Sequence, residues 1–326
     1  MQSVQINAFG KPWEVVETVP LPDPGAPGAG EIVVDMEFSP INPSDLVLIR
    51  GLYGVKPNLP APVGYEGVAR VVKIGANVTG LKEGDRVLYP RGTTTWATRS
   101  KVNANGLFAL PEHADPQQLS MLMVNPPTAY LLLTEYVPLK KGDWVLQTAG
   151  NSGVGRSVIA MAKQMGIHTV SVVRRPELVD ELKKLGGDVV LVEGPDLAKR
   201  VAEATGKAKI MLALDCVGGP GLMAVNDSLA NGGTLVAFGV MSGGPGPFFT
   251  APNIFRDLTL KGFWLLNWFN RNPTERVVEV QKKMAAWIAD GTIFTPIEAT
   301  YTLNEASAAL SHSAKGAGKI LFKGGR

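Results

Sequence analysis

Residues 144–175 read WVLQTAGNSGVGRSVIAMAKQMGIHTVSVVRR, and this stretch decides the fold. It opens with a short apolar run at 144–147, which is typical of a buried strand. A glycine-rich turn at 149–155 follows, and apolar residues then recur at helical spacing until Gly166 ends the helix. The β-branched run at 169–173 predicts a second strand. Strand, turn, helix and strand form a βαβ unit, whose turn and helix N-terminus suit a pyrophosphate.

The turn departs at one position from the dinucleotide-binding pattern Gly-x-Gly-x-x-Gly. Gly150 and Gly155 stand at the first and third glycine positions, whereas Ser152 stands at the second. The serine has a Cβ where backbone usually approaches phosphate, although its hydroxyl could donate to a phosphate oxygen. The alternative is a glycine-rich turn that binds no ligand. The flanking strands and the helix favour a dinucleotide site.

The end of the second strand discriminates between the two nicotinamide cofactors. An NAD site needs an acidic residue there to bind the ribose 2′-hydroxyl, and this chain has Arg174 and Arg175 instead. Two guanidinium groups match the charge and the paired acceptors of a 2′-phosphate. The sequence therefore predicts NADPH, and the alternative interpretation of the two arginines is a solvated basic loop.

Two kinds of pattern divide the chain. Short strand-like runs and proline-rich turns over 1–120 predict a compact, mostly antiparallel barrel domain. Alternating strands and helices over 121–292 predict a Rossmann-type, doubly wound parallel sheet, in which 258–268 is one further strand and 274–290 a periodic helix. The tail, 293–326, is expected to return to the first domain. The predicted fold class is thus α/β with a second, β-rich domain.

The composition excludes several classes of function. The net charge is +3 without a long basic run, so nucleic acid is not an expected partner. No apolar stretch has the length of a membrane span, and the one cysteine, Cys216, lies in an apolar run typical of a core. The three histidines, His113, His168 and His312, are too scattered for a metal site, so we expect no metal. A cytoplasmic location is the resulting expectation.

Two further stretches are candidates for chemistry. Tyr53 lies between Gly51 and Gly54 in a loop that we expect to be exposed, where it is either a hydrogen-bond donor to a substrate oxygen or a plain loop aromatic. The aromatic run at 260–268 is either core or subunit interface, or else a wall for an apolar substrate or the nicotinamide.

These residues resemble the medium-chain dehydrogenase/reductase superfamily. Its zinc alcohol dehydrogenases carry Cys where this chain has Asn42 and His where it has Tyr65, so the chain resembles a zinc-free branch. Within that branch it is most similar to the mitochondrial-type 2-enoyl thioester reductases. The shared stretches are INPSD (41–45), G-x-Y-G (51–54), VNPPTAY (124–130), NSGVG (151–155), VVR (172–174), DCVGG (215–219), GGT (232–234) and GFW (262–264).

The resemblance implies roles for individual residues. The first domain would be a GroES-like substrate domain, Tyr53 the active-site tyrosine, and the enzyme a homodimer formed through edge strands near 258–268. The predicted cofactor residues, including those of the glycine-rich turn, are Asn125, Gly150, Asn151, Ser152, Gly153, Val154, Gly155, Arg174, Arg175, Phe238, Gly239, Val240, Met241, Phe263, Trp264, Leu265 and Lys319.

The resulting hypothesis is NADPH-dependent reduction of a trans-2-enoyl thioester. Hydride would reach the β-carbon, and a proton would reach the α-carbon with Tyr53 either donating it or positioning the substrate. One alternative is a reductase of quinones or small enones such as alkenals and haloacrylates. Another, of a different class, is a non-catalytic NADPH-binding sensor or partner-binding protein.

Overall fold

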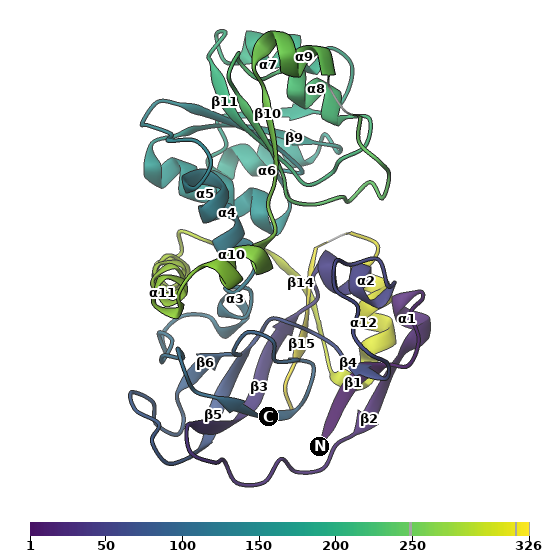
Figure 1. Cartoon of the computed structure of the whole chain (residues 1–326), viewed down its shortest axis with the longest axis vertical. Coiled ribbons are helices and arrows are strands. Elements are labelled where there is room, and N and C mark those ends of the chain that lie inside the picture. Colours follow the sequence, from purple (N-terminus) through teal and green to yellow (C-terminus); the bar gives the residue numbers. More distant parts are fainter. Residues whose placement is uncertain (248–249, 317, 326) are drawn as a thin grey trace. The chain divides into compact units, whose positions relative to one another are not determined.

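In the computed structural model, the residues described are all except 248–249, 317 and 326. The chain divides into two compact units. One is formed by 1–124 with 274–326, and the other by 125–273. Figure 1 shows the elements of each unit, coloured along the chain.

The second unit is built on a parallel sheet. Its strands in the described residues are β8 (Trp144–Thr148), β9 (His168–Val173), β10 (Val189–Val192), β11 (Ile210–Asp215), β12 (Thr234–Ala237) and β13 (Thr259–Gly262). Their spatial order is β10-β9-β8-β11-β12-β13, and every neighbouring pair is parallel. The chain builds one half outward from β8 and the other outward from β11. This confirms the predicted doubly wound sheet.

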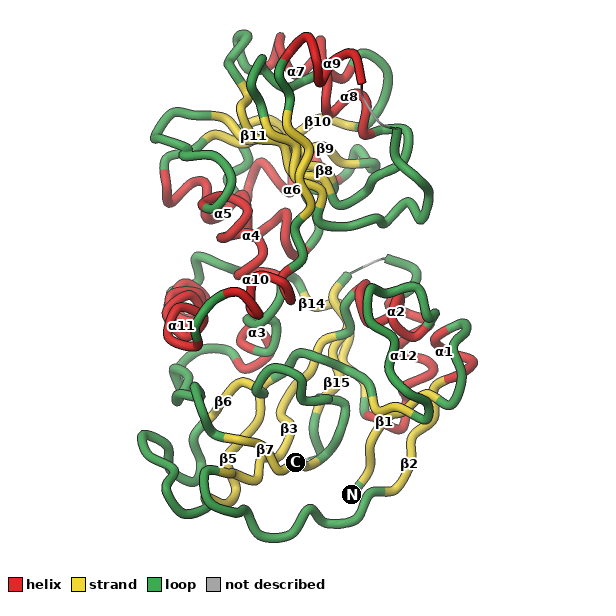
Figure 2. Tube along the Cα trace, viewed as in Figure 1, coloured by secondary structure: helices red, strands yellow, loops and turns green. Residues whose placement is uncertain are grey.

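Helices lie on both sides of this sheet (Figure 2). The helices of this unit are α4 (Asn125–Thr134), α5 (Gly153–Met165), α6 (Leu178–Leu185), α7 (Leu197–Ala204), α8 (Leu222–Asp227), α9 (Thr250–Arg256) and α10 (Leu265–Arg271). Val173 packs with residues of α5 and α6, whereas Val172 packs with residues of α7 and α8. Successive strand residues point to opposite faces, so these two helix pairs lie on opposite sides of the sheet.

The sequence predicted one strand over 258–268, and this prediction is wrong for the second half of that range. β13 stops at Gly262, Trp264 precedes the first turn, and α10 begins at Leu265. The aromatic residues suggested a strand because they are common in sheets. However, Leu265 and the buried Phe269 are four residues apart, which puts both on one face of a helix.

The first unit is rich in short strands. They are β1 (Gln2–Ile6), β2 (Val16–Pro20), β3 (Glu31–Pro40), β4 (Ala61–Pro62), β5 (Val68–Ile74), β6 (Arg86–Leu88), β7 (Arg99–Asn103), β14 (Ile297–Tyr301) and β15 (Lys319–Lys323). Within the described residues one sheet has the order β14-β15-β3-β5-β6 with β7 also on β3, and another has the order β2-β1-β4. β15 pairs antiparallel with β3, so the tail returns to the first unit as expected.

The helices of the first unit include one that the sequence placed in the other domain. They are α1 (Pro12–Val15), α2 (Pro43–Ile49), α3 (Pro116–Leu119), α11 (Thr274–Ala289) and α12 (Ala306–Ser313), with a short 3-10 helix at Leu303–Glu305. Helix α11 packs on α3, and the Gln281 amide lies 2.9 Å from the sulfur of Met123. Periodicity shows which face of a helix is buried but not which core receives it. The boundary therefore lies at 273 rather than 292.

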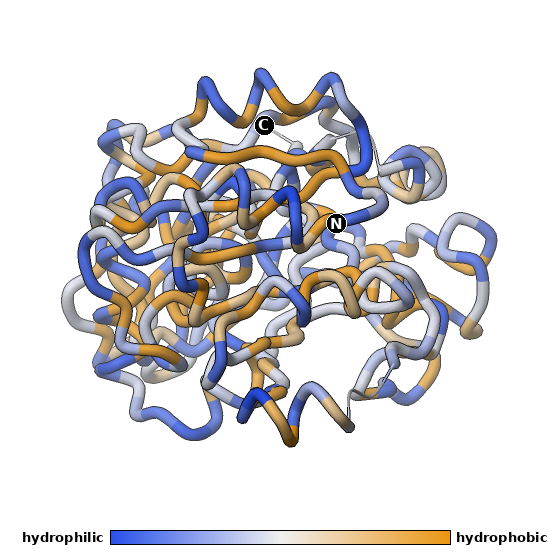
Figure 3. The backbone as a smooth tube through the Cα atoms, turned by 90° about the horizontal axis from the view of Figure 1, so that it is seen from above, coloured by the Kyte–Doolittle hydropathy of each residue, from blue (hydrophilic) through white to orange (hydrophobic). Residues whose placement is uncertain are grey.

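Hydrophobic residues are distributed through both units rather than concentrated in one long segment (Figure 3). Among the described residues, no helix combines the length and the apolar character that crossing a bilayer requires.

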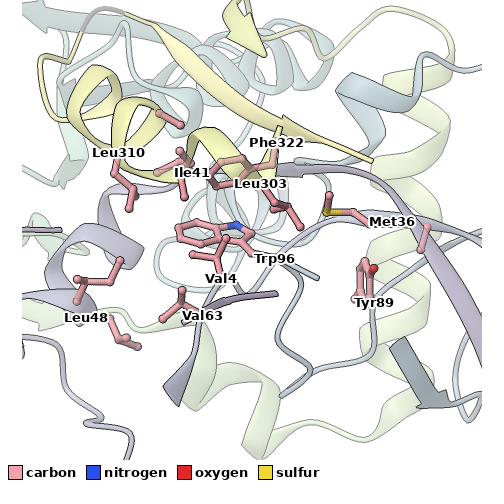
Figure 4. Packing of buried hydrophobic residues seen from close by; sticks show 14 of the residues in the cluster. Val4, Met36, Ile41, Leu48, Val63, Tyr89, Trp96, Leu303, Leu310 and Phe322 are labelled. Atoms are coloured by element: carbon pink, nitrogen blue, oxygen red, sulfur yellow. The ribbon is translucent and has the colours of Figure 1, made fainter. Parts of the chain in front are cut away.

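The core of the first unit is centred on Trp96 (Figure 4). Its indole is fully buried and meets the ring of Phe322, from the tail strand, edge to face with centroids 4.9 Å apart. Gly64 approaches the same indole. A Cβ added there would lie 2.3 Å from Cδ1 of Trp96, and the glycine also has φ +86°.

We expect Gly64→Ala to destabilise the first unit by about 1–3 kcal/mol more than Gly80→Ala does. Both glycines have positive φ, but an added Cβ at Gly80 meets nothing within 4 Å. The difference between the two variants therefore isolates the clash with Trp96 from the backbone strain that both share. Denaturant unfolding followed by tryptophan fluorescence measures it, and equal losses would contradict this account of the core.

Candidate functional site: a dinucleotide-binding edge and a buried polar network

The glycine-rich turn connects the carboxyl end of β8 to the start of α5. Ser152 is the N-cap of α5, and its Oγ accepts the backbone N–H of Gly155 at 3.0 Å. The serine at the second glycine position therefore has a structural role that glycine could not fill. Its hydroxyl hydrogen is still available to a phosphate oxygen, because the capping bond uses only the oxygen as acceptor.

The glycines of the turn lie so close to neighbouring atoms that a Cβ at these positions would clash. A Cβ at Gly155 would lie 2.6 Å from the carbonyl oxygen of Gly150, and one at Gly150 would lie 2.7 Å from Cβ of Ser171. Asn125, at the start of α4, also lies against the turn. Its Nδ2 would be 2.6 Å from a Cβ at Gly153. Residues far apart in the sequence thus meet at one backbone cradle, and this cradle fits a pyrophosphate.

Polar side chains at the ends of β8 and β11 support the turn, and sequence reasoning missed them. The Gln147 amide donates to the carbonyl of Gly155 at 3.0 Å and to Oγ of Ser171 at 2.9 Å. The Thr148 hydroxyl donates to Oδ1 of Asp215 at 2.7 Å. All of these side chains are buried. Their signal in the sequence was a polar residue at the last positions of an otherwise apolar strand.

The other predicted cofactor residues of the second unit follow neighbouring strands of the same sheet. Phe238–Met241 follow β12, and Phe263–Leu265 follow β13. The backbone N–H of Phe238 donates to Asp215 and that of Met241 to Cys216, which holds this segment beside the end of β11. The carboxyl ends of parallel strands share one edge, so the turn and these segments lie on that edge.

The two arginines at the end of β9 differ in their surroundings. Both are exposed, and Nε of Arg175 lies 3.6 Å from a carboxylate oxygen of Glu177. Arg174 makes no ion pair within the described part of the chain. Arg174 is therefore the better candidate for an incoming phosphate, since Arg175 would first have to give up a carboxylate partner.

Tyr53 lies in the first unit, on the loop between α2 and β4. The sequence predicted an exposed tyrosine, and this was wrong in part. Leu52 is 75% exposed, but Tyr53 is half-buried and packs against the core of its unit. The loop bends at Gly51, where an added Cβ would lie 2.9 Å from the ring of Phe9. This packing restricts the position of the Tyr53 side chain.

The first unit also contains a buried polar network around Lys319. The Lys319 amine donates to the carbonyl of Ile41 at 3.4 Å and to Oδ1 of Asn42. The Asn42 amide donates to Oε2 of Glu66 at 2.8 Å. The other oxygen of Glu66 accepts the backbone N–H of Val124 at 2.6 Å. Asn42 and Glu66 are almost completely buried, at 4% and 1% exposed.

Burial changes the ionisation of this network. It raises the pKa of Asp45 to about 7, and the neighbouring Glu66 adds to that rise, while the Asn42 N–H and Lys319 oppose it. Burial also raises the pKa of Glu66, against the opposing effects of Lys319 and of the hydrogen bonds from Asn42 and Val124. For Lys319, burial lowers the pKa, and both carboxylates counteract it. Each charge depends on its partners to remain ionised.

The resemblance described above places Asn42 and Tyr65 at two positions where zinc alcohol dehydrogenases carry Cys and His. Asn42 instead connects a lysine to a glutamate, and Tyr65 is 39% exposed. No group of three His, Cys, Asp or Glu side chains in the described residues could hold a metal ion. Cys216 is buried, and burial raises its thiol pKa to about 12, which suits a core residue.

Comparisons with known proteins agree with this architecture. Residues 28–111 match the alcohol dehydrogenase GroES-like domain, and residues 153–283 match the zinc-binding dehydrogenase family. The mitochondrial enoyl-[acyl-carrier-protein] reductase of Caenorhabditis elegans is 38% identical over 88% of this chain and 84% of its own. The human enzyme of the same name is 39% identical over 94% of this chain and 83% of its own.

Solved structures give the same result. The complex of Etr1p with NADP and crotonyl-CoA has a TM-score of 0.89 at 29% identity and covers 99% of both chains. The Etr1p/Etr2p heterodimer from Candida tropicalis, a mitochondrial 2-enoyl thioester reductase, has the same TM-score, identity and coverage. A protein named as an NADPH:quinone reductase from Bacillus thuringiensis has a TM-score of 0.90 at 27% identity, again covering 99% of both chains. The chain therefore belongs to the medium-chain dehydrogenase/reductase superfamily and, within it, to the family of mitochondrial-type enoyl thioester reductases.

Proposed function

We propose that the protein catalyses the NADPH-dependent reduction of trans-2-enoyl thioesters to saturated acyl thioesters. The observation that carries this proposal is the match, over 99% of the chain, to a reductase crystallised with NADP and crotonyl-CoA. The glycine turn, the exposed Arg174 and the Tyr53 loop supply the features that such a reaction needs.

The cofactor site proposed is the carboxyl edge of the parallel sheet, and Lys319 is a further proposed cofactor contact. The pyrophosphate would bind the backbone of the turn and the N-terminus of α5. Arg174, with Arg175 as a second partner, would hold the 2′-phosphate. The remaining proposed contacts are Asn125, Gly150, Asn151, Ser152, Gly153, Val154, Gly155, Phe238, Gly239, Val240, Met241, Phe263, Trp264 and Leu265.

The bound nicotinamide would supply a hydride to the β-carbon of the substrate. The chain's own task is to stabilise the negative charge that then develops on the thioester oxygen, and hydrogen-bond donors such as backbone N–H groups can do this. Tyr53 would complete the reaction by delivering a proton to the α-carbon or by holding the substrate for a water to do so.

We also propose a homodimer formed through β13. This strand is at the edge of its sheet, and all four of its residues are exposed. Leu260 on the strand and Phe255 on α9 expose apolar side chains, at 42% and 82%. An exposed edge strand of this kind favours pairing with a second copy of the chain. The Etr1p/Etr2p relative is a dimer.

The compartment stays a prediction. The sequence favours the cytoplasm, while the names of the curated relatives place those proteins in mitochondria.

A quinone or small-enone reductase is the second candidate, because the protein named as an NADPH:quinone reductase has a TM-score of 0.90 with this chain. The two candidates share fold and cofactor. They differ in whether the substrate is an acyl thioester.

The loss of NADPH absorbance with a series of acceptors tests the proposal. We expect turnover on crotonyl-CoA and trans-2-hexenoyl-CoA to exceed turnover on 1,4-benzoquinone and a small enal. Turnover on the quinone or enal alone would support the second candidate. NADPH binding without turnover on any acceptor would indicate a sensor or partner-binding protein.

Tyr53→Phe should lower kcat by roughly a hundredfold or more, which is the usual size of a proton-transfer contribution. NADPH affinity should change little, because the substitution removes only the hydroxyl. Steady-state kinetics together with a fluorescence titration of NADPH separates the two effects, and unchanged turnover would remove Tyr53 from the mechanism.

Arg174→Ala should weaken NADPH binding about ten- to a hundredfold through the loss of charge-assisted hydrogen bonds to the 2′-phosphate. NADH binding should hardly change, because NADH lacks that phosphate. Arg175→Ala is the matched control with a smaller expected effect, since Glu177 already engages its guanidinium. Equal losses for NADPH and NADH would exclude a phosphate contact at Arg174.

A further inference from the structure

Asn42 has a fixed orientation between two groups of opposite hydrogen-bonding character. Glu66 is an acceptor, so it receives the Asn42 amide N–H, at 2.8 Å. This leaves the Asn42 carbonyl oxygen to face the Lys319 amine, which is a pure donor. The orientation of the Asn42 amide is therefore set from both ends, by an acceptor at Glu66 and by a donor at Lys319.

Glu66 also holds the last residues of the first unit. Its second oxygen accepts the backbone N–H of Val124 at 2.6 Å, and the N–H of Met123 donates to the same carboxylate. Asn125, which lies against the glycine turn, is the next residue in the chain. The buried Glu66 carboxylate thus contacts the segment that leads to Asn125 directly. It is connected to Lys319 through the side chain of Asn42.

We infer that Glu66 and Asn42 are positioning residues for NADPH binding, with Asn42 acting as the link that presents an acceptor to Lys319. Lys319 has the carbonyl of Ile41 and the side chain of Asn42 as its hydrogen-bond acceptors within the described residues. An ammonium has three donors, so it can hold these two acceptors and offer the third to a ligand. This inference rests on the proposed NADPH site but not on the identity of the oxidised substrate.

The ionisation of the network agrees with this role. Burial by itself lowers the pKa of Lys319, and the nearby Glu66 and Asp45 carboxylates raise it again. Asp45 is held by the backbone N–H of Asn42 at 2.7 Å, on the same turn. A buried ammonium without these partners would lose its proton and its value as a donor to a phosphate or ribose oxygen.

A reversal of the hydrogen-bond polarity tests the inference. In Glu66→Gln, the amide oxygen can keep the Val124 N–H, so the new NH₂ faces Asn42. Asn42 must then turn its oxygen toward Gln and its NH₂ toward the Lys319 amine, which places donor against donor. In Asn42→Asp, two carboxylates face each other across the former 2.8 Å hydrogen bond. The double variant restores both links, since the glutamine donates to the aspartate and the aspartate accepts from Lys319.

We expect each single variant to raise the NADPH Kd by roughly tenfold and the double variant to recover most of that loss. The titration uses the protein and NADPH alone, without an enoyl substrate. A merely structural role predicts that the losses in NADPH affinity follow losses in the free energy of unfolding, so denaturant unfolding of every variant is measured in parallel. A double variant that binds NADPH no better than the single variants would overturn the inference.

A second arm keeps the test valid if Asn42→Asp does not fold. In a Lys319→Met background, Glu66→Gln should leave the NADPH Kd unchanged, because the group that Glu66 positions is already absent. A further tenfold loss would contradict the proposed route through Lys319. Substrate turnover by the unaltered protein is measured in parallel, so that failure of the reductase proposal is seen separately from failure of this one.

Discussion

The close approach of two backbone segments at the glycine turn is the constraint on which the second unit depends. Gly155 lies in the first turn of α5, and a Cβ added to it would lie 2.6 Å from the carbonyl oxygen of Gly150, which is too close for any side chain. This contact brings the helix N-terminus to the end of β8, where its free N–H groups face outward. The strand order reverses between β8 and β11, and open α/β sheets bind their ligands at such a switch point.

The first unit contributes a different kind of constraint. Glu66 and Asn42 are buried and Lys319 is partly buried, and removing one partner would leave an uncompensated charge. A polar network of this kind is weak evidence for stability and better evidence for function.

Hydrogen bonds hold both the backbone and a side chain of the segment at 41–45. Asp45 accepts the N–H of Asn42 and closes the first turn of α2, while the Asn42 side chain reaches Glu66. The backbone and side chain of Asn42 are thus both held. A side chain held at both ends can transmit the orientation of one neighbour to the next without any movement of the backbone.

The sequence by itself determined the βαβ unit, the doubly wound sheet, the β-rich first domain and the return of the tail, because periodicity and turn chemistry are local properties. The residues of the turn and Arg174 followed from the same pattern. Only the tertiary structure decided which core receives α11, that 265–271 is helical, and that Tyr53 is half-buried. It alone joined Glu66, Asn42 and Lys319, since hydrogen bonds between residues up to 277 positions apart leave no local signal. Such contacts exist only once the strands that carry them have paired.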